Sequence, residues 1–75
     1  MGTVINLANA GAVKRSVLEA CRRLGLCEQA RRDSVNRAMH ALRCGASPAK
    51  AVSCGRDMAR ALARAADMLR PDGAA

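Results

Sequence analysis

Apolar side chains recur every three or four residues along most of this chain, which is the spacing of one face of an α-helix. The first such stretch covers residues 10–24, and its basic side chains lie away from the apolar stripe. Gly25 follows, and glycine readily takes the left-handed conformation that ends a helix. We therefore expect a first helix over residues 10–24. Its stripe consists of Ala10, Val13, Val17, Ala20 and Leu24.

A second periodic stretch runs from residue 28 to residue 44. Glu28 at its start favours a helix, because a carboxylate stabilises the positive end of the helix dipole. The turns that follow, residues 29–34, are polar and hold no large apolar side chain. We expect a second helix over residues 28–44 whose first turns are weakly anchored. Its inner stripe is Val35, Ala38, Met39 and Leu42.

The end of this helix and the start of a third one stand side by side in the sequence. Gly45 can close the second helix, Ser47 can cap the next, and Pro48 suits a first helical turn. The result is a predicted helical hairpin with its corner at these residues. The third helix is expected over residues 48–70, followed by a mobile tail over residues 71–75.

The predicted third helix carries small and apolar residues at alternating spacings of three and four, as in the seam of a coiled coil. Half of the seam is Gly or Ala, so the backbone of a partner helix can approach closely. The chain has no Phe, Tyr or Trp, and a domain of 75 residues buries only a limited core. We expect one all-α three-helix domain over residues 1–70 that forms a homo-oligomer, most simply a two-fold dimer. The seam consists of Val52, Gly55, Ala59, Leu62, Ala66 and Leu69.

An N-terminal ribbon followed by helices is the alternative fold. Residues 3–7 alternate loosely between apolar and polar, which allows a short strand, an extended arm or a first helical turn. With a ribbon, residues 4–44 resemble the layout of the ribbon-helix-helix family. That resemblance implies a ribbon paired across a dimer, with outward side chains in the major groove. These would be Val4, Asn6 and Ala8, of which only Asn6 reads a base edge well.

Residues 41–52 resemble a helix-turn-helix, because Ala41 stands four residues before Gly45 and a small, capped helix follows. They depart from that pattern at Val52, which comes one residue late, and in the few polar groups at the start of the second helix. Tight helical hairpins in general share these features. The resemblance therefore implies no particular family.

Positive charge dominates the chain and points to an anionic partner. Thirteen Lys and Arg residues against six Asp and Glu residues give a net charge of +7, which favours nucleic acid, a lipid surface or an acidic protein. Guanidinium groups suit contacts with phosphate. The alternative is a solvated ridge in which Asp67 pairs with Arg64 and Arg70, each three residues away. The candidate binding residues are Arg56, Arg60 and Arg64 on one ridge of the third helix and Arg22, Arg23, Arg31 and Arg32 around the Gly25 corner.

Four cysteines and one histidine are the candidate metal ligands, but their spacing favours a structural role. The cysteines form no C-x-x-C pair, and a single histidine does not complete a zinc finger. His40 and Cys44 lie one helical turn apart and could touch one ion together. A bridge between Cys44 and Cys54 across the corner is also conceivable. We expect reduced, structural thiols at Cys21, Cys27, Cys44 and Cys54, no metal site and no cofactor.

The sequence shows no paired carboxylates, no Gly-rich phosphate loop and no nucleophile beside a base, so we expect no enzyme. The first thirteen residues lack the basic start of a secretory signal. We predict a small cytoplasmic regulator or accessory factor that binds nucleic acid through Arg-rich helix faces. The alternative is a protein–protein interaction module, an adaptor or inhibitor such as phages and plasmids encode, that docks on an acidic partner protein.

A membrane role is disfavoured by the same sequence. No stretch of about 18 apolar residues could span a bilayer. A helix that lies at the membrane surface usually carries Trp or Phe on its apolar face, and this chain contains neither.

Overall fold

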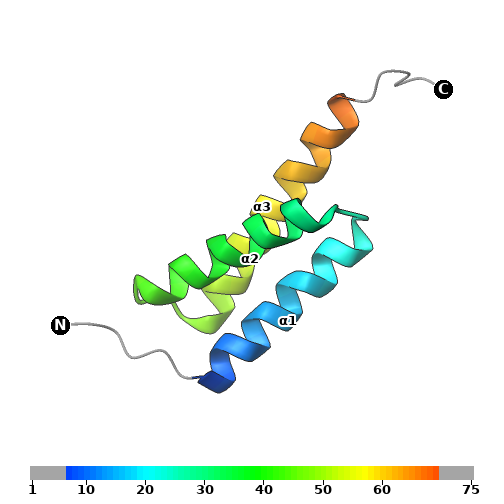
Figure 1. Ribbon diagram of the computed structural model, residues 1–75. Coiled ribbons are helices and arrows are strands. Elements are labelled where there is room, and N and C mark those ends of the chain that lie inside the picture. The colour runs from blue at the N-terminus through cyan, green and yellow to red at the C-terminus, as the bar shows by residue number, and fades with distance from the viewer. Residues whose placement is uncertain (1–6, 70–75) are drawn as a thin grey trace.

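Residues 7–69 are described by a computed structural model and form three helices and no strand (Figure 1). The all-helical prediction is therefore confirmed for this range. Ala8 of the alternative ribbon lies in the first helix, whereas Val4, Asn6 and the predicted tail lie outside the described residues. None of the described helices is long and apolar enough to cross a membrane. The helices are α1 (Leu7–Arg23), α2 (Glu28–Arg43) and α3 (Pro48–Met68).

The two connections between helices are built in the same way, because a left-handed glycine follows each of the first two helices. Gly25 has a φ of 68° and Gly45 a φ of 95°. The amide after each glycine donates back to a carbonyl five residues earlier, which is the mark of a Schellman motif. The prediction that these glycines end the helices is confirmed. The two hydrogen bonds run from Leu26 N–H to the Cys21 carbonyl (3.1 Å) and from Ala46 N–H to the Ala41 carbonyl (3.0 Å).

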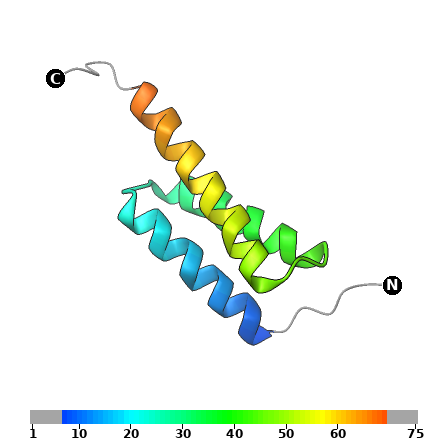
Figure 2. The ribbon, with the colours of Figure 1, turned by 180° about the vertical axis from the view of Figure 1, so that it is seen from behind.

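The core contains one row of buried residues from each helix, spaced every four residues. Rows with this spacing interlock when helices pack ridge into groove. The row on α3 is made only of Gly and Ala, so α3 lies close against α1 and α2 (Figure 2). The rows are Val13, Val17 and Cys21 on α1, Ser34, Ala38 and Leu42 on α2, and Ala51, Gly55 and Ala59 on α3.

At Gly55, α3 lies close against both other helices. A Cβ atom at this position would lie 2.6 Å from Val17 Cγ2 and 3.0 Å from Ala38 Cβ. Such distances are too short for real side chains, so any larger residue forces α3 away from the core. Packing, and not backbone conformation, therefore requires glycine here.

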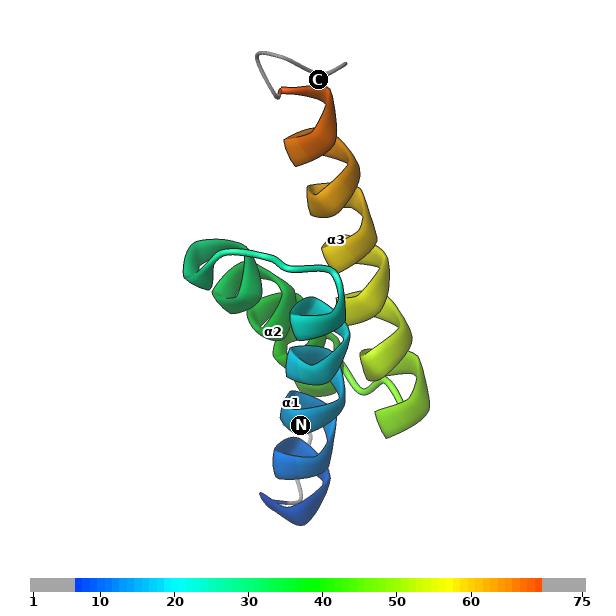
Figure 3. The ribbon, with the colours of Figure 1, turned by 90° about the vertical axis from the view of Figure 1, so that its right-hand side faces the viewer.

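The packing of α3 divides the predicted oligomer seam into two parts. Gly55 and Ala59 are buried within the single chain, and Val52 packs against the same core. This part of the seam is therefore already covered in the monomer. The other part lies where α3 projects beyond α1 and α2 (Figure 3). It consists of Leu62, which is half-buried, and Ala66 and Leu69, which are exposed.

The start of α2 is better anchored than its polar sequence suggested. Helix α2 begins at Glu28, and Ser34 is fully buried between the helices. The Ser34 hydroxyl donates a hydrogen bond of 2.9 Å to the carbonyl of Ala30. A buried hydroxyl costs little when it is satisfied in this way, so a small polar residue replaces the missing apolar anchor.

Candidate functional site

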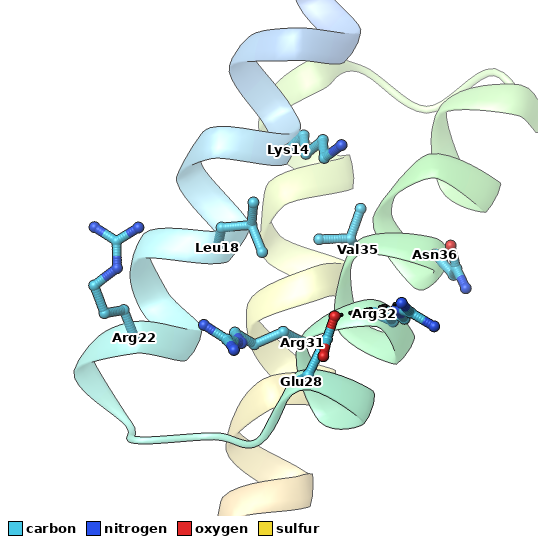
Figure 4. Close-up of a pocket in the computed structure, with 8 residues that line it drawn as sticks. All are labelled: Lys14, Leu18, Arg22, Glu28, Arg31, Arg32, Val35 and Asn36. Atoms are coloured by element: carbon cyan, nitrogen blue, oxygen red, sulfur yellow. Dashed lines mark hydrogen bonds and ion pairs between the residues drawn. The ribbon is translucent and has the colours of Figure 1, made fainter.

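A groove of about 370 Å³ lies between α1 and α2 and gathers much of the positive charge predicted to bind a partner. We call it the basic groove (Figure 4). Side chains of α1 spaced every four residues form one wall, and one face of the first half of α2 forms the other. The lining residues are Lys14, Leu18, Arg22, Glu28, Arg31, Arg32, Val35 and Asn36.

The basic groove has an apolar floor and a cationic rim. Figure 4 shows Leu18 and Val35 turned towards each other across the gap between the helices. Lys14 points towards α2 at one end, and Arg31 reaches towards α1 near the other. Both floor residues are half-buried, so they hold the two helices together while leaving the groove open to a ligand.

Most of the positive charge in this groove is not neutralised by a carboxylate. Glu28 is the one acidic side chain among the described lining residues, and its Oε1 lies 3.3 Å from Nη2 of Arg32. Among the described residues, no ion pair involves Lys14, Arg22 or Arg31. Three cations that share one concave surface raise the local concentration of anions. The groove therefore presents a net positive surface.

A smaller groove of about 230 Å³ between α1 and α3 brings together other predicted residues, and we call it the α1–α3 groove. Arg23 of the Gly25 corner lies there beside Arg56 and Arg60 of the α3 ridge. Two of the three are compensated: Arg23 pairs with Glu19 at 2.8 Å and Arg60 with Asp57 at 3.3 Å. Its net attraction for anions is therefore weaker than that of the basic groove.

The seven candidate arginines thus fall into separate places. Arg22, Arg31 and Arg32 share the basic groove, Arg23, Arg56 and Arg60 share the α1–α3 groove, and exposed Arg64 lies farther along α3. Among the side chains of the basic groove that can donate a hydrogen bond to an anion, sequence reasoning missed Lys14 and Asn36. Lys14 stands eight residues before Arg22 and thus on the same helix face, which was a usable signal. Nothing in the sequence marked Asn36.

A third groove, of about 590 Å³, lies at the end of the bundle where α3 projects, and we call it the apolar groove. One wall is the α1–α2 turn with the start of α2, and the other is the last two turns of α3. Leu24, Leu26, Ala30, Leu62 and Leu69 supply apolar surface. Among the described residues that line it, the ionisable carboxylates are Asp33 and Asp67, and no Lys or Arg takes part.

The cysteines take three different environments, and all four are free thiols. Cys21 is fully buried in the core, Cys54 is half-buried, and Cys27 and Cys44 are exposed. Sγ of Cys44 lies 3.6 Å from Nε2 of His40 at the end of α2. Within the described residues, no third Cys, His, Asp or Glu joins this pair. Burial as a small apolar residue therefore applies to Cys21 and not to the two exposed cysteines.

Comparison with known proteins leaves these grooves as the basis for any functional assignment. No protein-family model, no curated protein and no solved structure matches the chain.

Proposed function

We propose that this chain is a small cytoplasmic regulator or accessory factor that binds nucleic acid without catalysing a reaction. The observation that carries the proposal is the set of three cations around the basic groove, Lys14, Arg22 and Arg31, without a carboxylate partner among the described residues. Backbone phosphates supply closely spaced negative charges, and a protein that neutralises them gains affinity by releasing counterions. A net charge of +7 adds long-range attraction.

The proposed contacts go to phosphates more than to bases. Arginine and lysine side chains on helix surfaces position a protein on the backbone and carry little sequence information. Asn36 at the edge of the basic groove is the one side-chain amide among its described lining residues, and an amide can pair with adenine. The proposal is therefore a binder with high charge dependence and low sequence selectivity.

The test removes the charge of the groove without removing its shape. In the groove variant, Lys14→Gln, Arg22→Gln and Arg31→Gln are combined, and glutamine keeps the helix propensity nearly unchanged. The matched control combines Arg15→Gln, Arg37→Gln and Arg43→Gln, which removes the same charge from exposed positions that line none of the three grooves. Fluorescence anisotropy with labelled duplex DNA and single-stranded RNA measures affinity from about 50 mM salt upwards.

We expect the groove variant to flatten the log-log salt dependence by about 2 to 3 units, since each lost phosphate contact removes nearly one unit on duplex DNA. The control should flatten it by less than about 1 unit, through the smaller overall charge alone. Equal losses in both variants would show that binding follows total charge and not the groove. A wild type that binds neither polymer at about 50 mM salt would end the nucleic-acid proposal.

An acidic protein partner is the second candidate, and the floor of the basic groove favours it. Leu18 and Val35 offer an apolar strip between cations, which suits an acidic amphipathic helix. Such an interface depends on apolar burial, so its affinity should fall less steeply with salt than phosphate binding. Leu18→Ala should then weaken the partner more than it weakens nucleic acid.

A two-fold dimer is part of the same proposal. The described core contains Val13, Val17 and Leu42 but consists otherwise of cysteine, serine, alanine and glycine. Small domains with so little large apolar surface inside commonly gain stability by association. Two copies would also present two basic grooves to one polymer, which raises the effective affinity.

A further inference from the structure

Exposed large apolar side chains gather at one end of this molecule. Among the described residues they are Leu24, with 42% of its surface exposed, Met68 with 84% and Leu69 with 81%. Leu24 belongs to the α1–α2 turn, and the other two belong to the end of α3, which projects past the bundle (Figures 1 and 3). Leu24 and Leu69 line the apolar groove together. A contiguous apolar surface of this kind usually marks an interaction site.

The shape of the apolar groove suits a helix. Ala65 and Ala66 on the α3 wall have short side chains that allow a second backbone to come close. Leu26 and Leu62 are half-buried at its base, so the floor is held by the bundle itself. A helix with small and leucine-sized side chains on one face could therefore lie between the turn and α3.

Charge separates this groove from the rest of the surface. The ionisable side chains among its described lining residues are the carboxylates Asp33 and Asp67, together with the thiol of Cys27. The whole chain carries a net charge of +7. Two copies that met through the basic groove or the α1–α3 groove would place like charges against each other. At the apolar groove they would bring together no Lys or Arg of the described lining, and the carboxylates would lie between two chains of net positive charge, which lowers their repulsion.

We propose that the apolar groove binds a second copy of this chain, with the last turns of each α3 lying in the groove of the other copy. The proposal rests on the proposed dimer and names its surface. The end of α3 brings an apolar face of Leu62, Ala66 and Leu69, while Arg60 and Arg64 lie on the opposite side of the same segment. The end of α3 forms a wall of the apolar groove in its own chain and would also be the segment bound in the groove of the other copy. A two-fold axis therefore lets both copies make the same contacts.

The proposal also explains why half of the α3 seam is exposed. Gly55 and Ala59 pack inside the single chain, whereas Ala66 and Leu69 continue the seam past the bundle, where no other described helix covers them. A second α3 covers this remainder. Dimerisation then completes a packing surface that the monomer uses in part.

The first test compares neighbouring exposed residues inside and outside the groove. The variant Ala66→Gln with Leu69→Gln adds polar bulk to the groove, and Met68→Gln, the control, changes an equally exposed residue that does not line it. All three positions are exposed, so circular dichroism should show an unchanged helix content. Sedimentation equilibrium without nucleic acid follows association up to about 100 µM, at about 500 mM salt to screen the repulsion between the two chains.

We expect the wild type and Met68→Gln to form dimers with similar dissociation constants. The variant changed at Ala66 and Leu69 should have a dissociation constant at least about ten-fold higher. A monomeric wild type at the highest concentration overturns the proposal. An equal loss of dimer affinity in Met68→Gln also overturns it, and so does an unchanged affinity in the variant changed at Ala66 and Leu69, because the interface would then lie elsewhere. None of these outcomes depends on nucleic acid, so the dimer can fail while the proposed binding function stands.

The second test uses two native thiols as reporters. Cys27 lines the apolar groove, whereas Cys44 is exposed at the α2–α3 connection and lines none of the three grooves. Alkylation followed by peptide mass spectrometry gives the modification rate of each. We expect the rate at Cys27 to fall as protein concentration rises through the dimer range, while the rate at Cys44 stays constant. Rates that stay constant at both thiols would contradict the proposed interface.

Discussion

The basic groove and the apolar groove share one short segment of chain but have opposite character. The segment from Arg22 to Arg31 supplies Arg22, Glu28 and Arg31 to the basic groove, and Leu24, Leu26 and Ala30 to the apolar one. The Schellman turn at Gly25 reverses the chain between the two helices, so neighbouring residues face different sides of the molecule. The comparison teaches that a turn of four residues can separate a cationic groove from an apolar one.

The largest expected effect comes from a change in the core that both grooves depend on. Gly55→Leu places a side chain where a Cβ atom alone would lie 2.6 Å from Val17, so α3 must leave the core. We expect the free energy of unfolding to fall by about 3 kcal/mol or more, measured by urea denaturation. Nucleic-acid binding and dimerisation should both weaken with it.

The matched control for that change is another helical glycine. At Gly11 the nearest atom to an added Cβ would be Nη1 of Arg15 at 3.5 Å, which is ordinary contact. Gly11→Ala should therefore raise stability by about 0.5 to 1 kcal/mol, because alanine is the better helix former. If Gly55→Leu proved as harmless as Gly11→Ala, the close packing of α3 described above would be wrong.

The next largest effect separates the two grooves. We expect the triple change at Lys14, Arg22 and Arg31 to weaken nucleic-acid binding roughly 100-fold at low salt and to leave the dimer dissociation constant unchanged in about 500 mM salt. The double change at Ala66 and Leu69 should weaken the dimer and lower polymer affinity only through lost avidity. Fluorescence anisotropy measures nucleic-acid affinity and sedimentation measures the dimer dissociation constant, each on both variants. A variant that reduced both properties equally would show that the grooves act as one surface.

A smaller effect is expected from the α3 ridge. Changing Arg56, Arg60 and Arg64 to Gln removes three charges, but Arg60 is already compensated by Asp57. We therefore expect about ten-fold weaker nucleic-acid binding, equal for related and unrelated sequences. Competition with several unlabelled duplexes measures this. A larger loss than in the basic-groove variant would move the principal contact surface to the α1–α3 groove.

The smallest effect concerns the two turns themselves. Ser47 and Cys27 cap α3 and α2 with nearly the same backbone, at φ −66° and ψ 158° against φ −68° and ψ 168°. Ser47 accepts a hydrogen bond from the Lys50 amide, and Cys27 makes no such side-chain bond. Ser47→Ala should cost about 1 kcal/mol, and Cys27→Ser should add up to about 1 kcal/mol. Thermal unfolding of both variants tests this, and a loss of stability in Cys27→Ser would contradict it.

Much of the fold could be predicted because its signals are local. Gly25 and Gly45 end α1 and α2 as expected, and Ser47 with Pro48 begins α3. The candidate site was less accessible, because the seven arginines are equally charged wherever they point. Arg22 and Arg23 are adjacent in sequence, yet they line different grooves. Which arginine is neutralised depends on carboxylates one helical turn away, and which groove it joins depends on a helix elsewhere in the chain.

By itself the sequence determined where α1 and α2 end and where α3 begins, since capping and glycine conformation act within a few positions. It did not determine the start of α1, which lies at Leu7 and not at residue 10. Only the tertiary structure decided which face of α3 is inside. Gly55 and Ala59 fit the sequence pattern of an intermolecular seam, but both are buried within their own chain, Gly55 against Val17 and Ala38. The reason is that burial depends on the fit between side chains far apart in sequence, and no local pattern specifies that fit.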